Sequence, residues 1–163
     1  MLPGRFTVRL AKQDFKFSAA HFTLFPDGTA ELLHGHNFQV AVALTGDRLD
    51  EEGLLIDFAA VKRAVRAACA RLDGKTLVPG RAPRVRLRRR GEGLEIDSDS
   101  ARYLLPARDV SVLPLENTSV ELLARLLWEE IAPALAGSEV QELAVAVAET
   151  SGQSCRYTAP LNP

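Results

Sequence analysis

The sequence predicts an α+β fold in which an antiparallel β-sheet carries two helices on one face. Segments in which every second residue is apolar, as in half-buried strands, lie near both ends of the chain. Two segments between them have apolar residues at every third or fourth position, which is typical of amphipathic helices. The length of 163 residues fits one domain, residues 1–163, with a core of its own.

Strands are expected throughout the N-terminal part of the chain. Residues 5–10 alternate, and residues 15–21 continue that strand or form a bulged extension of it. Pro, Asp and Gly at 26–28 have the chemistry of a turn. The next strand covers residues 38–44, and one of its faces carries Phe38, Val40, Val42 and Leu44.

A first helix is expected after Asp57, whose side chain can cap the helix N-terminus. Gly74 ends this helix, because glycine is common just beyond the last helical turn. Cys69 lies beside the apolar stripe and is expected to behave as a small core residue. The stripe itself consists of Phe58, Val61, Val65, Ala68 and Leu72.

Residues 79–114 are expected to form an insertion with extra strands. The alternation over 84–88, a turn at 90–93 and a return over 94–96 predict a β-hairpin. This segment also contains a charge cluster, for which three interpretations stay open. The first is a solvated strand face that protects a sheet edge, and the second is a contact for an anion such as a substrate triphosphate. The third is a nucleic-acid surface, although no interleaved aromatic residues support it. The clustered residues are Arg81, Arg84, Arg86, Arg88, Arg89 and Arg90.

Thr118 is expected to begin the second helix, because Glu121 follows three residues later in the spacing of a capping box. The last long strand covers residues 143–149, and Glu149 ends its apolar face. A short final strand is expected over residues 155–158. The apolar stripe of the second helix consists of Val120, Leu123, Leu127, Ile131 and Leu135.

The composition predicts a cytoplasmic enzyme. Apolar residues make up 47% of the chain, charged residues make up 25%, and the formal net charge is −1. A balance this close to zero gives no reason to expect a nucleic-acid or anionic-membrane partner. Residues 1–5 lack the apolar core of a signal peptide, and no apolar run approaches the roughly 20 residues of a membrane span. Cys69 and Cys155 do not make a disulfide framework.

All three histidines of the chain fall within residues 21–36. His34 and His36 are two residues apart, so they share one face of a strand. His21 ends the preceding strand, and antiparallel pairing of the two strands would bring the three imidazoles together. Three imidazole nitrogens with an open fourth position describe a catalytic zinc site. The pattern alone leaves open whether these residues bind metal or are packed and surface histidines.

Six short motifs in the chain resemble, in order, those of the 6-pyruvoyl-tetrahydropterin synthase family, which includes the 6-carboxytetrahydropterin synthases. The resemblance covers most of the chain outside residues 79–114. It implies the tunnel fold, in which trimers close their sheets into one barrel and two trimers stack as a hexamer, with sites between subunits. The motifs are Phe17-Ser18-Ala19-Ala20-His21, His34-Gly35-His36-Asn37, residues 53–58 with Val61-Lys62, Leu72-Asp73, residues 117–121 and residues 147–150.

The resemblance implies that His21, His34 and His36 bind Zn²⁺, which in the family binds hydroxyls of dihydroneopterin triphosphate. Bacterial members have a basic cysteine four residues before His-Gly-His, where this chain has Ala30. The family's Leu-Asp-His motif ends here in glycine, so Asp73 alone remains of its Asp-His pair.

Glu31 completes a Glu-x-x-His-Gly-His pattern. This pattern resembles a subgroup associated with side-chain cleavage to 6-hydroxymethyl-7,8-dihydropterin, in which a glutamate replaces the cysteine as base. The resemblance also implies that Glu149 holds the pterin and that Thr118 and Ser119 lie in the neighbouring contact region.

These features lead to a zinc-dependent pterin lyase as the first hypothesis. A zinc protein that binds a pterin or a purine-like ligand without catalysis is the second. A protein in which zinc is purely structural is the third.

Overall fold

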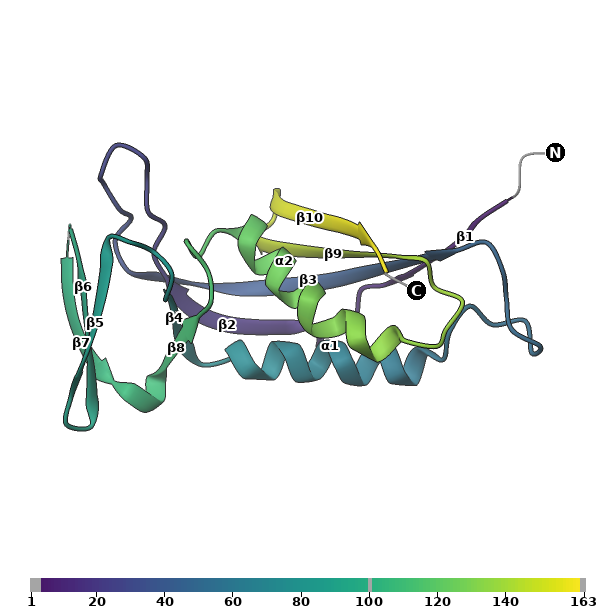
Figure 1. The fold of residues 1–163 in the computed structure, drawn as a ribbon, viewed down its shortest axis with the longest axis horizontal. Coiled ribbons are helices and arrows are strands. Elements are labelled where there is room, and N and C mark those ends of the chain that lie inside the picture. Colours follow the sequence, from purple (N-terminus) through teal and green to yellow (C-terminus); the bar gives the residue numbers. More distant parts are fainter. Residues whose placement is uncertain (1–3, 100, 162–163) are drawn as a thin grey trace.

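The computed structural model describes residues 4–99 and 101–161, so both ends of the predicted domain, residues 1–3 and 162–163, lie outside it. The described residues form a long curved sheet, two α-helices and a separate small sheet (Figure 1). The strands are β1 (Phe6–Leu10), β2 (Lys16–His21), β3 (His34–Gly46), β4 (Lys75–Pro79), β5 (Val85–Arg90), β6 (Gly93–Ser98), β7 (Ala101–Pro106), β8 (Val110–Leu113), β9 (Glu142–Thr150) and β10 (Gln153–Pro160), and the helices are α1 (Phe58–Leu72) and α2 (Val120–Ile131).

The main sheet has the order β10-β9-β3-β2-β4-β8, with β1 paired to β3. Strands β1 and β2 both pair antiparallel with β3, at Val8↔Leu44 and at Phe17↔Phe38. They therefore follow one another along the same edge of β3, as an interrupted strand. This confirms the prediction that the second segment extends the first.

The main sheet also contains parallel pairs that the sequence did not predict. Strand β4 pairs parallel with β2 at Ala19↔Lys75 and with β8 at Val78↔Val112. Its central residues Leu77 and Val78 are both buried. A strand buried on both faces does not alternate, so period-two analysis misses it.

Both helices pack on one face of the main sheet, as predicted. Asp57 caps α1 by accepting a hydrogen bond from the backbone N–H of Ala59 at 2.8 Å. Phe58 departs from the predicted stripe, because it is 40% exposed. No α-helix in the described ranges is long and apolar enough to cross a bilayer. The core between helices and sheet includes Phe17, Phe38, Val40, Val42, Leu44, Val61, Val65, Ala68, Leu72, Leu123, Leu127, Ile131, Leu143, Val145 and Val147.

The predicted capping box at the start of α2 is wrong. The N-cap residue is Ser119, and its side chain makes no capping hydrogen bond. The hydroxyl of the fully buried Thr118 instead donates to the backbone carbonyl of Phe22 at 2.7 Å. The sequence spacing is correct for a cap, but the threonine is used to bind a distant segment.

Strands β5, β6 and β7 form the small sheet, which lies at one end of the molecule next to β4 and β8 (Figure 1). The predicted hairpin is the β5–β6 pair, and β7 adds a third antiparallel strand. The outer face of the hairpin carries ion pairs, in which Glu95 lies 3.2 Å from Arg90 and 3.9 Å from Arg88. Part of the predicted arginine cluster is therefore paired on a solvated strand face.

Candidate metal centre

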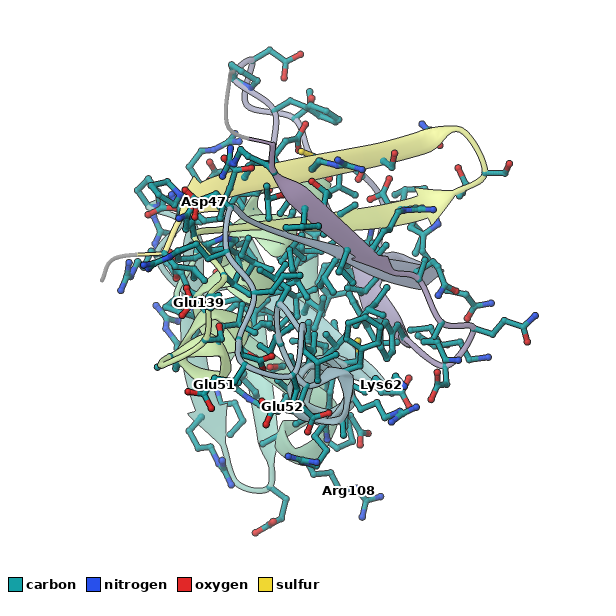
Figure 2. The ribbon with its side chains drawn as sticks, turned by 90° about the vertical axis from the view of Figure 1, so that its right-hand side faces the viewer. Asp47, Glu51, Glu52, Lys62, Arg108 and Glu139 are labelled. Atoms are coloured by element: carbon teal, nitrogen blue, oxygen red, sulfur yellow. The ribbon has the colours of Figure 1, made fainter. Side chains whose placement is uncertain are left out.

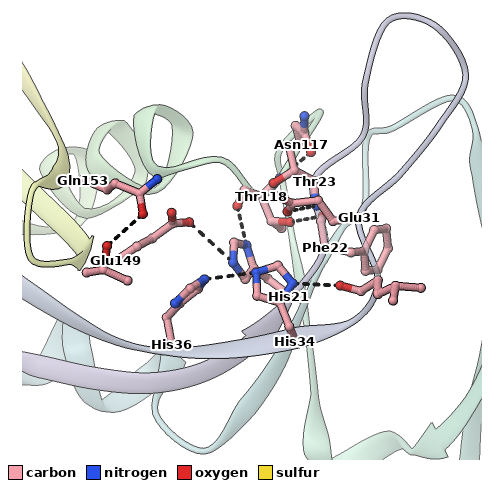
Figure 3. Close-up of polar contacts among 12 residues, drawn as sticks. His21, Phe22, Thr23, Glu31, His34, His36, Asn117, Thr118, Glu149 and Gln153 are labelled. Carbon is pink, nitrogen blue, oxygen red and sulfur yellow. Dashed lines mark hydrogen bonds and ion pairs between the residues drawn. The ribbon is translucent and has the colours of Figure 1, made fainter.

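The β2–β3 ladder brings the three histidines together. His21 lies directly opposite His34 in the antiparallel register, and Ala19 lies opposite His36. His34 and His36 share the face of β3 that also carries the buried Phe38. The potential ligand atoms of the three imidazoles all lie within 4.8 Å of one another (Figure 3).

Backbone carbonyls determine which nitrogen carries the proton in two of the three rings, those of His21 and His34. His21 Nδ1 lies 2.9 Å from the carbonyl oxygen of Thr118, and His34 Nδ1 lies 2.7 Å from that of Leu32. A carbonyl can only accept, so both Nδ1 atoms must donate. The Nε2 atoms of His21 and His34 are then free to bind a metal through their lone pairs.

The contacts of the Nε2 atoms fit a bound cation. His34 Nε2 and His36 Nε2 are 3.0 Å apart, and the buried Nε2 of His21 makes no hydrogen bond to any of the described residues. Burial lowers the pKa of His21, although the Thr118 carbonyl and Glu149 oppose this shift. Burial thus favours the neutral imidazole, which is the form that ligates zinc. The donor set therefore suits a divalent metal with nitrogen preference.

Glu149 lies beside this cluster, at the end of β9. Its carboxylate is 3.4 Å from His21 Nε2, and its side chain is 19% exposed. Strand β9 runs antiparallel to β3 with Ala148 opposite Gln39, which brings the end of β9 next to the histidines. A partly exposed carboxylate here can accept N–H groups from a bound heterocycle.

Glu31 lies in the 22–33 loop, which joins His21 to His34. Its carboxylate accepts a hydrogen bond from the backbone N–H of Thr23 at 3.0 Å, and its own backbone N–H donates to the Thr23 carbonyl at 2.9 Å. Burial, the largest single influence, raises the pKa of Glu31. The Thr23 hydrogen bonds and the nearby histidines together outweigh burial, so the pKa lies below its ordinary value. Glu31 is therefore ionised at neutral pH.

Asp73 and Thr118 have structural contacts that sequence reasoning did not anticipate. Asp73 follows the last turn of α1, and its carboxylate accepts from the backbone N–H of Ser18 on β2 at 2.7 Å. Thr118 provides the backbone carbonyl that orients His21. Neither side chain contacts the imidazoles among the described hydrogen bonds and ion pairs.

Sequence reasoning missed the supporting roles of Thr23 and Asn117. Thr23 holds Glu31, and nothing in the local sequence marks it for this role. Asn117 donates from its amide to the Leu24 carbonyl at 2.9 Å and accepts from the Leu24 N–H at 3.0 Å. Its position at the start of the 117–121 motif was a usable signal.

Comparisons with known proteins give a consistent result. The model of the family described as 6-pyruvoyl tetrahydropterin synthase matches residues 10–160. A Methanocaldococcus jannaschii protein, provisionally named a 6-carboxy-5,6,7,8-tetrahydropterin synthase, is 32% identical over 145 residues, which cover 87% of this chain and 88% of that protein.

Solved structures extend this result. The crystal structure of Plasmodium vivax 6-pyruvoyl tetrahydropterin synthase is 29% identical, covers 96% of this chain and 99% of that one, and has a TM-score of 0.86. Two variants of the P. vivax enzyme replace a glutamate described as a catalytic residue. The Plasmodium falciparum structure, 24% identical, covers 96% of this chain and 98% of that one with a TM-score of 0.89 and adds evidence for the fold. These likenesses confirm the predicted α+β tunnel fold.

Proposed function

The chain belongs to the 6-pyruvoyl tetrahydropterin synthase family, and we propose that it is a zinc-dependent lyase acting on dihydroneopterin triphosphate or a related pterin. The observation that carries this proposal is the convergence of His21, His34 and His36. The orientation of His21 and His34 by backbone carbonyls adds support, because ordered second contacts are typical of metal-binding histidines.

His21, His34 and His36 would hold the zinc ion, and bound Zn²⁺ would supply a Lewis acid that polarises the hydroxyls of the substrate side chain. The ladder between β2 and β3 would hold the three imidazoles in place for the ion. The Thr118 and Leu32 carbonyls prevent rotation of two of the rings.

Glu31 is the proposed general base. Its carboxylate is ionised at neutral pH, and one of its oxygens remains available beyond the Thr23 N–H bond. The two cysteines are poor substitutes, because burial raises the pKa of Cys69 to about 12 and also raises the pKa of Cys155. The catalytic glutamate of the P. vivax relative supports a carboxylate in this role. We propose side-chain cleavage to 6-hydroxymethyl-7,8-dihydropterin as the reaction.

Glu149 is the proposed pterin holder, because its two oxygens can accept N–H groups from one edge of the heterocycle. Ser119, whose hydroxyl does not cap α2, is proposed to contact the substrate directly. Thr118 would contribute through His21, since its hydroxyl is bonded to Phe22. Asp73 would contribute to catalysis by holding β2 through Ser18.

We also propose a trimer or hexamer with sites between subunits. The face of the main sheet opposite the helices carries small side chains, and a hollow of about 310 Å³ lies on it. Strand β10 leaves one edge of this sheet open, and closure between copies would cover such an edge. Sedimentation at micromolar concentration tests this, and a monomer would contradict it. The hollow is lined by Arg9, Ala11, Lys12, Gln13, Gln39, Val40, Ala41, Ala146, Ala148 and Ser154.

A zinc-bearing pterin binder without catalysis is the second candidate, favoured by Ala30 and Gly74 at two positions where the family's proton-handling groups are expected. Incubation of the zinc-loaded protein with dihydroneopterin triphosphate, followed by chromatography, distinguishes the two. Product above the level of a chelator-treated control supports the lyase. Neopterin binding without product supports the binder. Loss of folding on chelation, without pterin binding, supports a structural zinc.

A further inference from the structure

The apolar face of the small sheet is buried against the 22–33 loop. Phe22 is 1% exposed and stacks on Tyr103 of β7, with ring centroids 6.2 Å apart. Leu24 and Leu33 belong to the same cluster. A small sheet must cover its apolar face to be stable, and here the loop provides part of the cover. The other members of this second core are Val78, Val85, Leu87, Leu94, Ile96, Leu105 and Val110.

Polar contacts attach the same loop to its surroundings at successive residues. Arg84, which immediately precedes β5, donates from Nη2 to the backbone carbonyl of Phe25 at 2.7 Å. Asn117 bonds both backbone groups of Leu24, and Thr118 bonds the carbonyl of Phe22. Residues 22–25, the first limb of the loop, are therefore held by the segment next to the small sheet on one side and by the start of α2 on the other.

Glu31 lies on the returning limb of the loop, residues 29–33, and makes hydrogen bonds across the loop to the first limb. Its backbone N–H and its carboxylate both bond to Thr23, which lies between Phe22 and Leu24. Any displacement of the first limb would consequently move the Glu31 carboxylate. The histidines at the two ends of the loop are held separately, by the β2–β3 ladder.

We propose that the small sheet is a brace that positions Glu31 relative to the histidine cluster, with Arg84 as a positioning residue. This inference rests on the proposed function, in which Glu31 takes a proton from the substrate. Misplacement of a catalytic group by about 1 Å can cost roughly 10²-fold in rate. The brace predicts that Arg84 affects the reaction step and leaves both zinc and substrate binding in place.

Arg84→Ala tests the brace in the zinc-loaded full-length protein. We expect kcat to fall about tenfold, the order expected for loss of one charge-assisted hydrogen bond, while KM and zinc content stay unchanged. Hydrogen exchange at the Thr23 and Glu31 amides should become about tenfold faster. Arg84→Lys keeps a charged donor and should restore part of both. Arg86→Ala is the matched control, because Arg86 is exposed on β5, on the face away from Val85 and Leu87.

Unchanged exchange at Thr23 and Glu31 in Arg84→Ala would overturn the brace. So would faster exchange with unaltered kcat, since the loop would then be loosened without any effect on the base. An equal effect of Arg86→Ala would show that general loss of charge is responsible and would also overturn it. If the wild-type protein turns over no pterin, the proposed function fails, and the exchange measurements alone decide whether Arg84 holds the loop.

Discussion

The three histidines and Glu31 lie within the same small region, but the fold holds them in different ways. The histidines are side chains of paired strands, and His21 and His34 face one another in a continuous ladder. Glu31 belongs to a loop, where its carboxylate has the Thr23 N–H as a partner. The histidine cluster is held by the main sheet, whereas Glu31 is held by contacts within its loop, which packs against the small sheet.

This difference separates two functions that a zinc enzyme needs. Metal ligands must keep a fixed mutual geometry, and a sheet supplies it through regular backbone hydrogen bonds. A general base must reach a substrate proton, and a loop allows its position to be adjusted by neighbouring elements. Substitutions in the two regions should therefore fail in different ways.

The largest expected effect is on the strand side. His36→Ala removes one of the three proposed imidazole ligands, and we expect zinc content to fall from about one ion per chain to nearly none, with loss of activity. Metal analysis of the purified protein measures this. Asn37→Ala, the next position on β3 and on its other face, is the control and should retain zinc. Unchanged zinc in His36→Ala would show that the cluster is not the metal site.

The next effect is on the loop side. Glu31→Gln keeps an oxygen that can accept from Thr23 but removes the proposed base, so kcat should fall by about 10²- to 10⁴-fold. Zinc content and neopterin affinity should stay the same, because the loss is confined to the transition state. Glu52→Gln is a suitable control, since Glu52 is exposed (Figure 2) and belongs to the loop between β3 and α1, at the opposite end of the molecule from the small sheet (Figure 1). Loss of neopterin binding in Glu31→Gln would contradict the assigned role.

Glu149 should behave differently from Glu31, since it lies on a strand and is proposed to hold the pterin. Glu149→Gln removes the charge and replaces one acceptor oxygen by an N–H₂ donor, so the charge-assisted pair of hydrogen bonds to the pterin is lost. Such bonds contribute roughly 1.5–3 kcal/mol, so neopterin affinity should fall about 10- to 150-fold. Fluorescence titration measures this, with Glu142→Gln at the other end of β9 as the control. If Glu31→Gln weakens binding and Glu149→Gln does not, the two roles are reversed.

The arrangement of β2, β3 and their histidines was also the part that the sequence could predict. Phe17 and Phe38 each belong to an alternating segment, and their rings stack with centroids 4.7 Å apart across β2 and β3. The same alternation predicted that His34 and His36 lie on one face of the strand. Period-two patterns contain this information because a one-residue shift of register would expose every buried side chain.

The loop side was not predictable from local sequence. Thr23 holds Glu31 across eight residues, and Thr118 holds Phe22 across 96 residues. Such contacts depend on the tertiary fold, so the spacing of Thr118 and Glu121 predicted a cap that does not form. The pairing of β4 was not predicted for a related reason, because its neighbours β2 and β8 are distant in sequence.

The smallest expected effect concerns pH and acts on the stability of the metal-free protein. Folding lowers the pKa of His21 below 6.5, chiefly through burial, with His34 and His36 adding to the shift and Glu149 opposing it. The unfolded chain then binds more protons than the folded one below about pH 6.5, so stability should decline as the pH falls from there. Folding also lowers the pKa of Glu31, from an ordinary value of 4.5. Its stabilising contribution is present above that value and is lost as the pH falls through the folded pKa.

Stability should therefore decline in two separate pH ranges. The range due to His21 begins near pH 6.5, and the range due to Glu31 lies below pH 4.5. Denaturant unfolding of chelator-treated protein, measured from about pH 8 down to about pH 2 at fixed ionic strength, should show both. For one group the slope cannot exceed about 1.4 kcal/mol per pH unit. His21→Asn should flatten the decline in the upper range only, and Glu31→Gln that in the lower range only. If neither substitution flattens the decline in its own range, other groups set the dependence of stability on pH, and the assignment of the two ranges to His21 and Glu31 is wrong.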